Sequence, residues 1–131
     1  MAQQWQELQN SLSHLNQIQI PRCVTNSNVE SYELHGFSDA STVAYGACIY
    51  VRSIFADGSA KMSLLTSKST LAPIHDLSIQ RKELCAALLL ARLIKKVVAE
   101  MKLEFREVLW CDSTIVLAWI KKPLNQLKLF V

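Results

Sequence analysis

Apolar residues recur in different patterns along the chain, and the pattern changes at about residue 33. Within residues 2–17 they stand three or four positions apart in a Gln- and Asn-rich stretch (Trp5, Leu8, Leu12 and Leu15). This spacing predicts an amphipathic helix with a narrow apolar stripe. Pro21 ends that pattern, because the residue before a proline disfavours helical geometry. Residues 23–33 are polar and predict a connector.

From Glu33 onward the chain predicts three consecutive strands. Leu34–Asp39, Ala44–Ser53 and Lys61–Ser67 are strand-like, and the second is rich in Tyr, Ile and Val. Asp57-Gly58 is a turn signal between the second and third runs. Short connections between strands predict an antiparallel meander. Residues 68–78 predict a polar loop.

The clearest predicted element is a long helix over about residues 78–101, rich in the strong helix formers Leu and Ala. Ser78 is a candidate N-cap. The expected apolar stripe consists of Leu84, Leu88, Ala91, Ile94, Val98 and Met101.

The apolar run Val108–Cys111 follows and predicts a strand buried on both faces. Residues 113–120 predict a short helix that stops at Pro123. Residues 124–131 are apolar-biased and give no assignment.

This order predicts an α/β fold in which a helical crossover adds a strand to a three-stranded meander. We expect residues 1–32 to form an N-terminal helix and connector, the tail of a preceding region. Residues 33–131 then form the main domain.

Composition narrows the class of protein. The chain has 131 residues and half of them are apolar, which is typical of one globular domain. Its four cysteines form no C-x-x-C pair, so a zinc site is not expected, and we expect free thiols in a reducing compartment. No membrane span or signal peptide is predicted. Residues 1–60 carry two basic and five acidic side chains, whereas residues 61–131 carry twelve basic and six acidic. A basic second half suits a polyanionic partner, but from charge alone ordinary solvated lysines on helix faces are the favoured explanation.

Three acidic residues stand where α/β proteins place function. Asp39 lies in the first predicted strand on the face of His35 and Phe37, Glu83 lies in the first turn of the long helix, and Asp112 ends the buried strand. Carboxylates held together repel one another, and divalent cations such as Mg²⁺ remove that penalty. Each has another interpretation: an Asx turn for Asp39, a helix-dipole contact for Glu83 and an N-cap for Asp112.

The order strand–Asp, helix–Glu, strand–Asp-Ser resembles the ribonuclease H family. Four segments are similar to its BEL/Pao retrotransposon branch: Glu33–Ser41, Ala44–Tyr50, Arg81–Leu93 and Leu109–Thr114. The resemblance spans the whole chain, and the four motifs stand in the family's order.

The resemblance implies that the chain cuts the RNA strand of RNA–DNA hybrids during reverse transcription. By this resemblance Asp39, Glu83 and Asp112 bind two Mg²⁺ ions, for which Mn²⁺ can substitute, in an in-line displacement at phosphorus. It also implies that five residues contact the hybrid: Ala40, Ser41, Ser78, Gln80 and Arg81.

Further expectations concern partners and location. The reverse transcriptase region of the polyprotein is the expected protein partner, with no membrane. The expected location is intracellular, in the cytoplasm, a virus-like particle or the nucleus. The candidates for phosphate contact are Lys68, Lys95, Lys96, Lys121 and Lys122.

The family pattern includes a fourth acidic residue in a later helix, whereas this chain has no Asp or Glu after Asp112. We therefore expect a C-terminally truncated domain with exposed apolar surface. A second hypothesis is a non-catalytic, nucleic-acid-binding or structural remnant of the same fold. An aspartic protease is a third, but Asp112-Ser113-Thr114 lacks the Gly of that signature and a long helix has no place in an all-β fold. An actin-like ATPase is disfavoured, because the chain has no Gly-rich phosphate loop.

Overall fold

The structure is a computed structural model that describes residues 1–73, 77–123 and 127. Its elements in chain order are α1 (Ala2–Leu12), η1 (Ser13–Gln17), β1 (Val29–Ala40), β2 (Ala44–Phe55), β3 (Ala60–Leu71), α2 (Ile79–Met101), β4 (Arg106–Cys111) and α3 (Thr114–Ile120). Every element expected from the sequence is present, which confirms the α/β fold. The unassigned stretch 124–131 lies outside the described residues, apart from residue 127.

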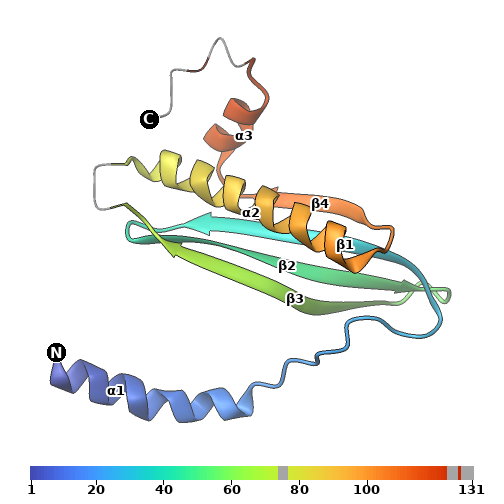
Figure 1. Cartoon of the computed structure of the whole chain (residues 1–131), viewed down its shortest axis with the longest axis horizontal. Coiled ribbons are helices and arrows are strands. Elements are labelled where there is room, and N and C mark those ends of the chain that lie inside the picture. Colours follow the sequence, from blue (N-terminus) through green and yellow to red (C-terminus); the bar gives the residue numbers. More distant parts are fainter. Residues whose placement is uncertain (74–76, 124–126, 128–131) are drawn as a thin grey trace.

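The four strands form one mixed sheet in the order β3-β2-β1-β4 (Figure 1). β1 pairs antiparallel with β2, and β2 pairs antiparallel with β3, so the predicted meander is confirmed. β4 returns through α2 and pairs parallel with β1. β1 begins at Val29, inside the stretch that polarity alone marked as a connector.

The start of α2 and the turn between β2 and β3 follow local chemistry that the sequence predicted. The Ser78 side chain accepts a hydrogen bond from the backbone N–H of Arg81, which confirms this N-cap of α2. Gly58 adopts a φ of 84° in the turn between β2 and β3, where a residue without Cβ is favoured.

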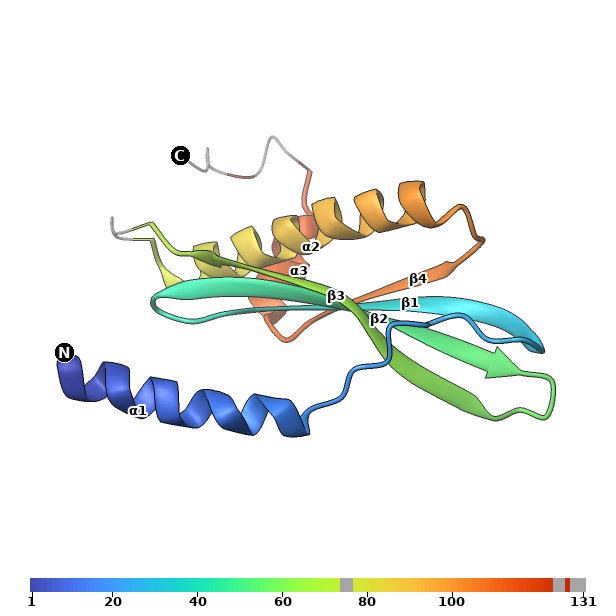
Figure 2. The same ribbon diagram turned by 60° about the horizontal axis from the view of Figure 1, so that its bottom comes forward.

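Only one face of the sheet is covered by packed helices, α2 and α3 (Figure 2). α1 lies on the other side of the sheet but does not cover that face (Figure 2). No side chain of α1 is buried, and its apolar stripe, which includes Trp5 and Leu8, is exposed. None of the described helices combines the length and apolar character needed to cross a membrane.

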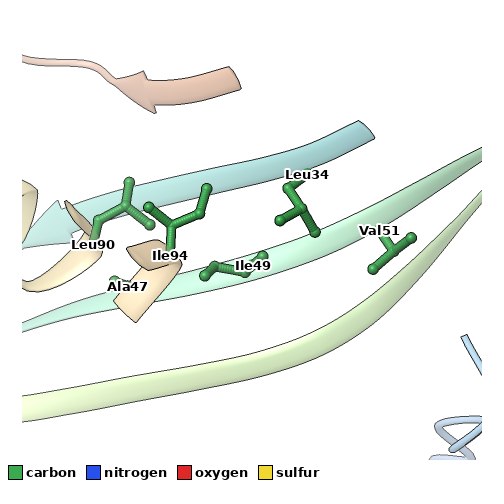
Figure 3. Close-up of a cluster of buried hydrophobic side chains, with 6 residues drawn as sticks. All are labelled: Leu34, Ala47, Ile49, Val51, Leu90 and Ile94. Carbon is green, nitrogen blue, oxygen red and sulfur yellow. The ribbon is translucent and has the colours of Figure 1, made fainter. Parts of the chain in front are cut away.

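The core lies between α2 and the centre of the sheet. Leu34 of β1 and Ile49 and Val51 of β2 point toward Leu90 and Ile94 of α2 (Figure 3). All five side chains are at most 4% exposed. Burial of such side chains stabilises a fold by about 1.5–3 kcal/mol each, so this layer holds the helix on the sheet.

The expected apolar stripe of α2 is correct at Ile94, which is buried, and at Val98, which packs against the core, but wrong at Leu88 and Ala91, which are exposed. The side chains buried against the sheet are Ala86, Leu90 and Ile94, whereas Leu88 is 50% exposed. Apolar residues occupy most of the helix circumference, so more than one stripe of i, i+3 and i+4 positions fits the sequence. Contact with the sheet selects the stripe that is buried.

The expectation that β4 is buried on both faces is also wrong. Leu109 is 47% exposed and Trp110 is 52% exposed. β4 is an edge strand of the described sheet, so it has a neighbouring strand, β1, on one side only in this part of the chain. The apolar run therefore predicted the strand correctly but did not predict how much of it is buried.

Candidate active site on the open sheet face

Strand alternation in β1 separates the core from the candidate site. Leu34 and Ser38 are buried on the side of α2, and a Cβ built on Gly36 would meet Leu90 of that helix. Side chains of neighbouring strand residues point to opposite faces. Phe37 and Asp39 therefore point to the open face, as the alternation predicted, and both are exposed.

Asp112 reaches the same end of the same face. In the parallel pair of β1 and β4, Phe37 stands opposite Trp110 and Ser38 opposite Cys111. Asp39 is the next residue of β1 and Asp112 directly follows the last residue of β4, and both line a cavity of about 890 Å³. The sequence analysis predicted that these two carboxylates lie close together; in the structure both residues line this one cavity.

The floor of this cavity comes from the neighbouring strand. Gly46 stands opposite Asp39 in β2 and has no side chain to fill the space above it. A Cβ there would lie 3.4 Å from the carbonyl oxygen of Lys68, an ordinary van der Waals contact. The cavity remains open beside Asp39 because this position is a glycine.

Three further residues named by the sequence analysis also line the cavity: Ala40, Ser41 and Lys68. Tyr45 and Cys48 line it as well and were not expected. The signal that identifies them is their place in β2 opposite β1, which depends on the strand register.

Glu83 is not among the residues that line this cavity. It lies in the first turn of α2, half-buried, three and seven residues before the sheet-facing Ala86 and Leu90. The Lys82 ammonium donates a hydrogen bond to the carbonyl of Thr42 in the β1–β2 loop. This contact holds the first turn of α2 at the end of the sheet where β1 finishes.

The structure thus brings two of the three predicted carboxylates to one cavity and leaves Glu83 outside its lining. Among the described residues, no three His, Cys, Asp or Glu side chains form a group that could hold a metal ion. α2 covers one face of the sheet whereas Asp39 lies on the other, which explains the separation.

The other predicted contact residues lie at the start of α2. Ser78, Gln80 and Arg81 are not among the lining residues of the cavity. The Ser78 hydroxyl caps the helix through the Arg81 backbone N–H at 3.4 Å. Ser41 also has a structural task, because its hydroxyl donates to the carbonyl of Ala44 at 3.0 Å and shapes the β1–β2 loop.

The alternative structural roles of the two aspartates find no support. Asp39 Oδ1 accepts a hydrogen bond from the backbone N–H of the next residue, Ala40, at 2.7 Å, whereas an Asx turn bonds two residues on. The N-cap of α3 is Ser113, whose hydroxyl accepts from the Val116 backbone N–H at 3.3 Å. Asp112 is therefore not the cap of that helix.

An ion-pair network lies farther along the open face. The Glu33 carboxylate contacts His35 Nε2 at 3.0 Å and Arg52 Nη1 at 2.9 Å, and Arg106 Nη1 approaches it at 3.7 Å. The hydrogen bonds from His35 and then Arg52 hold the pKa of Glu33 below its usual range. This network fixes charged groups on β1, β2 and β4 at one place.

Aromatic rings occupy the space between that network and the cavity. The Trp110 ring lies nearly parallel to the rings of Phe37 and His35, with interplanar angles of 9° and 16°. Tyr50 meets Phe37 edge-on at a centroid distance of 5.9 Å. The sequence analysis did not identify this row, although the two-residue spacing of His35, Phe37 and Asp39 indicated their common face.

Comparison of the sequence with known proteins identifies the family of this chain. No curated protein matches the chain. A family model described as "Pao retrotransposon-like RNaseH-like domain" matches residues 1–113, which include β1 with Asp39, α2 with Glu83 and β4 with Asp112. With most of its length matched and a mixed four-stranded sheet of the expected order, the chain belongs to the family of Pao retrotransposon-like RNaseH-like domains.

Proposed function

We propose that this domain hydrolyses the RNA strand of RNA–DNA hybrids, with the reaction centred on the cavity that Asp39 and Asp112 line. The observation that carries the proposal is the convergence of these two exposed carboxylates from adjacent strands. Membership of an RNaseH-like family supports the same class of chemistry. Nothing about base sequence is required, because a hybrid offers its shape and its 2′-hydroxyl groups.

The donors at the cavity fit magnesium. Mg²⁺ is usually bound by one or two carboxylates and completes its shell with water and substrate phosphate. Asp39 and Asp112 supply that number of carboxylates, whereas Glu83, proposed as a third ligand on the family resemblance, does not line the cavity in this structure. When bound, two such cations supply positive charge at the reacting phosphate and lower the cost of ionising a water. Mn²⁺ shares the preference for oxygen ligands and is expected to substitute.

The chain's own residues would position the substrate. Lys68 of β3, which is exposed beside the cavity, would supply a positive charge for a phosphate. Asp39 is oriented by the Ala40 N–H, which leaves its second carboxylate oxygen for a cation.

The remaining contacts are proposed on the family resemblance. Gln80 and Arg81 would contact the hybrid near Glu83, at the end of the sheet where the Lys82–Thr42 contact holds α2. The reverse transcriptase region of the same polyprotein is the proposed protein partner. Hydrolysis of the hybrid is proposed to take place inside the cell, in the cytoplasm, a virus-like particle or the nucleus.

Cleavage of an end-labelled RNA–DNA hybrid tests the proposal. The chain is incubated with millimolar Mg²⁺, and the products are separated by size. Asp39→Asn keeps the shape of the side chain and removes its charge. We expect the rate to fall at least about 100-fold, the scale for loss of one electrostatic contact in a reacting site.

The matched control is Glu100→Gln, which removes an exposed carboxylate near the end of α2, away from the cavity. Its rate should equal that of the unchanged chain. If the unchanged chain binds the hybrid but leaves it intact with both Mg²⁺ and Mn²⁺, the nuclease proposal fails. The non-catalytic, nucleic-acid-binding alternative then takes its place.

A further inference from the structure

We propose that Lys82 is a positioning residue for the substrate, because it fixes the start of α2 relative to the loop between β1 and β2. It thereby sets the spacing between two groups of residues that are proposed to contact the hybrid. One group, Ala40 and Ser41, lies where β1 ends and this loop begins. The other, Gln80 and Arg81, lies in the first turn of α2. The inference rests on the proposed function for the nature of the ligand.

Lys82 extends the buried row of α2 toward the end of the sheet at which β1 finishes (Figure 1). The buried side chains of α2 follow it at steps of four residues: Ala86, Leu90 and Ile94. Residues four apart lie on the same side of a helix, and helical side chains lean toward the helix N-terminus. The apolar stem of Lys82, which is half-buried, therefore points past the packed core, and its ammonium reaches the loop.

The group that accepts this hydrogen bond is held in place on both sides. The Lys82 ammonium donates to the carbonyl of Thr42. Before Thr42, the Ser41 hydroxyl accepts a hydrogen bond from the backbone N–H of Val43 at 3.3 Å. After it, the Val43 carbonyl accepts from the backbone N–H of Ala72, just beyond β3, at 2.8 Å. The loop thus presents the Thr42 carbonyl at a defined place relative to the sheet.

The first turn of α2 needs such an anchor. Among the described residues of α2, the first buried side chain is Ala86, one turn after Lys82. The Ser78 cap orders the first turn within the helix, but it does not connect that turn to the sheet. Segments with few buried contacts open more readily than the core. The Lys82 bond therefore limits movement where Gln80 and Arg81 would touch the hybrid.

A direct contact between Lys82 and a phosphate is the competing explanation, because an ammonium has three donors and Thr42 uses one of them. The two explanations differ in the residues through which Lys82 acts. A positioning residue acts through Gln80 and Arg81, so its loss costs nothing further once both side chains are removed. A phosphate ligand contributes by itself, whichever residues stand at those two positions.

Hybrid binding without cleavage tests the inference. Fluorescence anisotropy follows a labelled RNA–DNA hybrid titrated with the full chain in EDTA. Lys82→Met keeps much of the side-chain length and removes the donor. We expect it to weaken binding about three- to tenfold, because the freed first turn must be ordered when the hybrid binds. Lys82→Arg keeps a donor at similar reach and should restore most of the affinity. When Gln80→Ala and Arg81→Ala are both present, Lys82→Met should cause no further loss.

The matched control is Lys61→Met, which removes an exposed lysine of β3 that stands opposite Ser53, away from the β1–β2 loop. Its affinity should equal that of the unchanged chain. Circular dichroism checks that each variant folds, and Lys82→Leu takes the place of Lys82→Met if that variant does not. The inference is overturned if Lys82→Met binds like Lys61→Met, if Lys82→Arg binds as weakly as Lys82→Met, or if Lys82→Met costs as much without Gln80 and Arg81 as with them.

Failure of this inference differs from failure of the proposed function. Lys82-dependent binding of a hybrid that stays intact with Mg²⁺ and Mn²⁺ would refute the nuclease function alone. Cleavage by the unchanged chain, with unaltered affinity in Lys82→Met, would refute the positioning role alone. If the unchanged chain does not bind the hybrid, both are refuted.

Discussion

Substitution of Gly36 by alanine should loosen the contact between α2 and the sheet. Gly36 lies in the middle of β1, on the face that α2 covers. A Cβ built there would lie 2.6 Å from Leu90 Cδ1 and 2.9 Å from Leu109 Cδ2. Carbon atoms in contact are normally about 3.5–4.0 Å apart, so the shortfall is about 1 Å on the side of Leu90.

The two neighbours differ in their freedom to move. Leu109 is 47% exposed on an edge strand and can turn away from the new methyl group. Leu90 is only 2% exposed and packs among core side chains, so it must leave its rotamer or push α2 outward. Overpacking of this kind costs about 1–3 kcal/mol. Loss of glycine flexibility in the unfolded chain offsets about 0.4–1 kcal/mol, which leaves a net destabilisation of about 1–2 kcal/mol.

Urea unfolding followed by circular dichroism measures this change. With a slope of about 1–3 kcal/mol per molar urea, the midpoint of Gly36→Ala should fall by about 0.3–2 M. Gly46→Ala is the matched control, because it also lies in a strand and its Cβ would have no contact closer than 3.4 Å. It should be as stable as the unchanged chain or more stable by up to about 1 kcal/mol.

The difference between the two variants is the quantity of interest, because both lose the same glycine freedom in the unfolded state. Equal midpoints for Gly36→Ala and Gly46→Ala would refute the reasoning. Such a result would mean that α2 does not press on β1 at this point, and the core drawn from Leu90 would have to be revised.

Two further changes test the charge network and the phase of α2. Glu33 has a lowered pKa in the folded chain, so its contribution to stability is complete above the usual pKa of a Glu and is lost as the pH falls through the folded value. The urea midpoints of the unchanged chain and Glu33→Gln should therefore differ at pH 7 and converge toward pH 3; a constant difference would argue against the network. Leu90→Ala should cost about 2–5 kcal/mol, whereas Leu88→Ala on the exposed side should cost less than about 0.5 kcal/mol. If both variants lose the same stability in thermal unfolding, Leu88 is as buried as Leu90, and the stripe expected from the sequence is the correct one.

Local patterns determined much of the framework. The serine before α2 and the Asp57-Gly58 turn act within a few residues, so the chain segment itself contains the physical cause. Alternation in β1 likewise placed Phe37 and Asp39 on one face, because a strand has a period of two whatever it pairs with. These features follow from backbone geometry and were predictable.

Tertiary structure decided which surfaces are covered. Most of the circumference of α2 is apolar, and only contact with the sheet selects Leu90 over Leu88 for burial. The run that forms β4 is apolar enough for an interior strand, yet its place at the edge of the described sheet leaves Trp110 exposed. Burial depends on neighbours that are distant in sequence, so local hydrophobicity could not settle it.

The candidate site divides in the same way. The sequence by itself determined the kinds of side chain and the elements that carry them, because motif order and strand period are properties of the chain. Only the strand register set Asp112 beside Asp39, opened the space above Gly46, and left Glu83 outside that cavity. The physical reason is that alternation fixes a face relative to a strand, whereas the distance between two strands, or between a strand and a helix, is fixed only when they pack together.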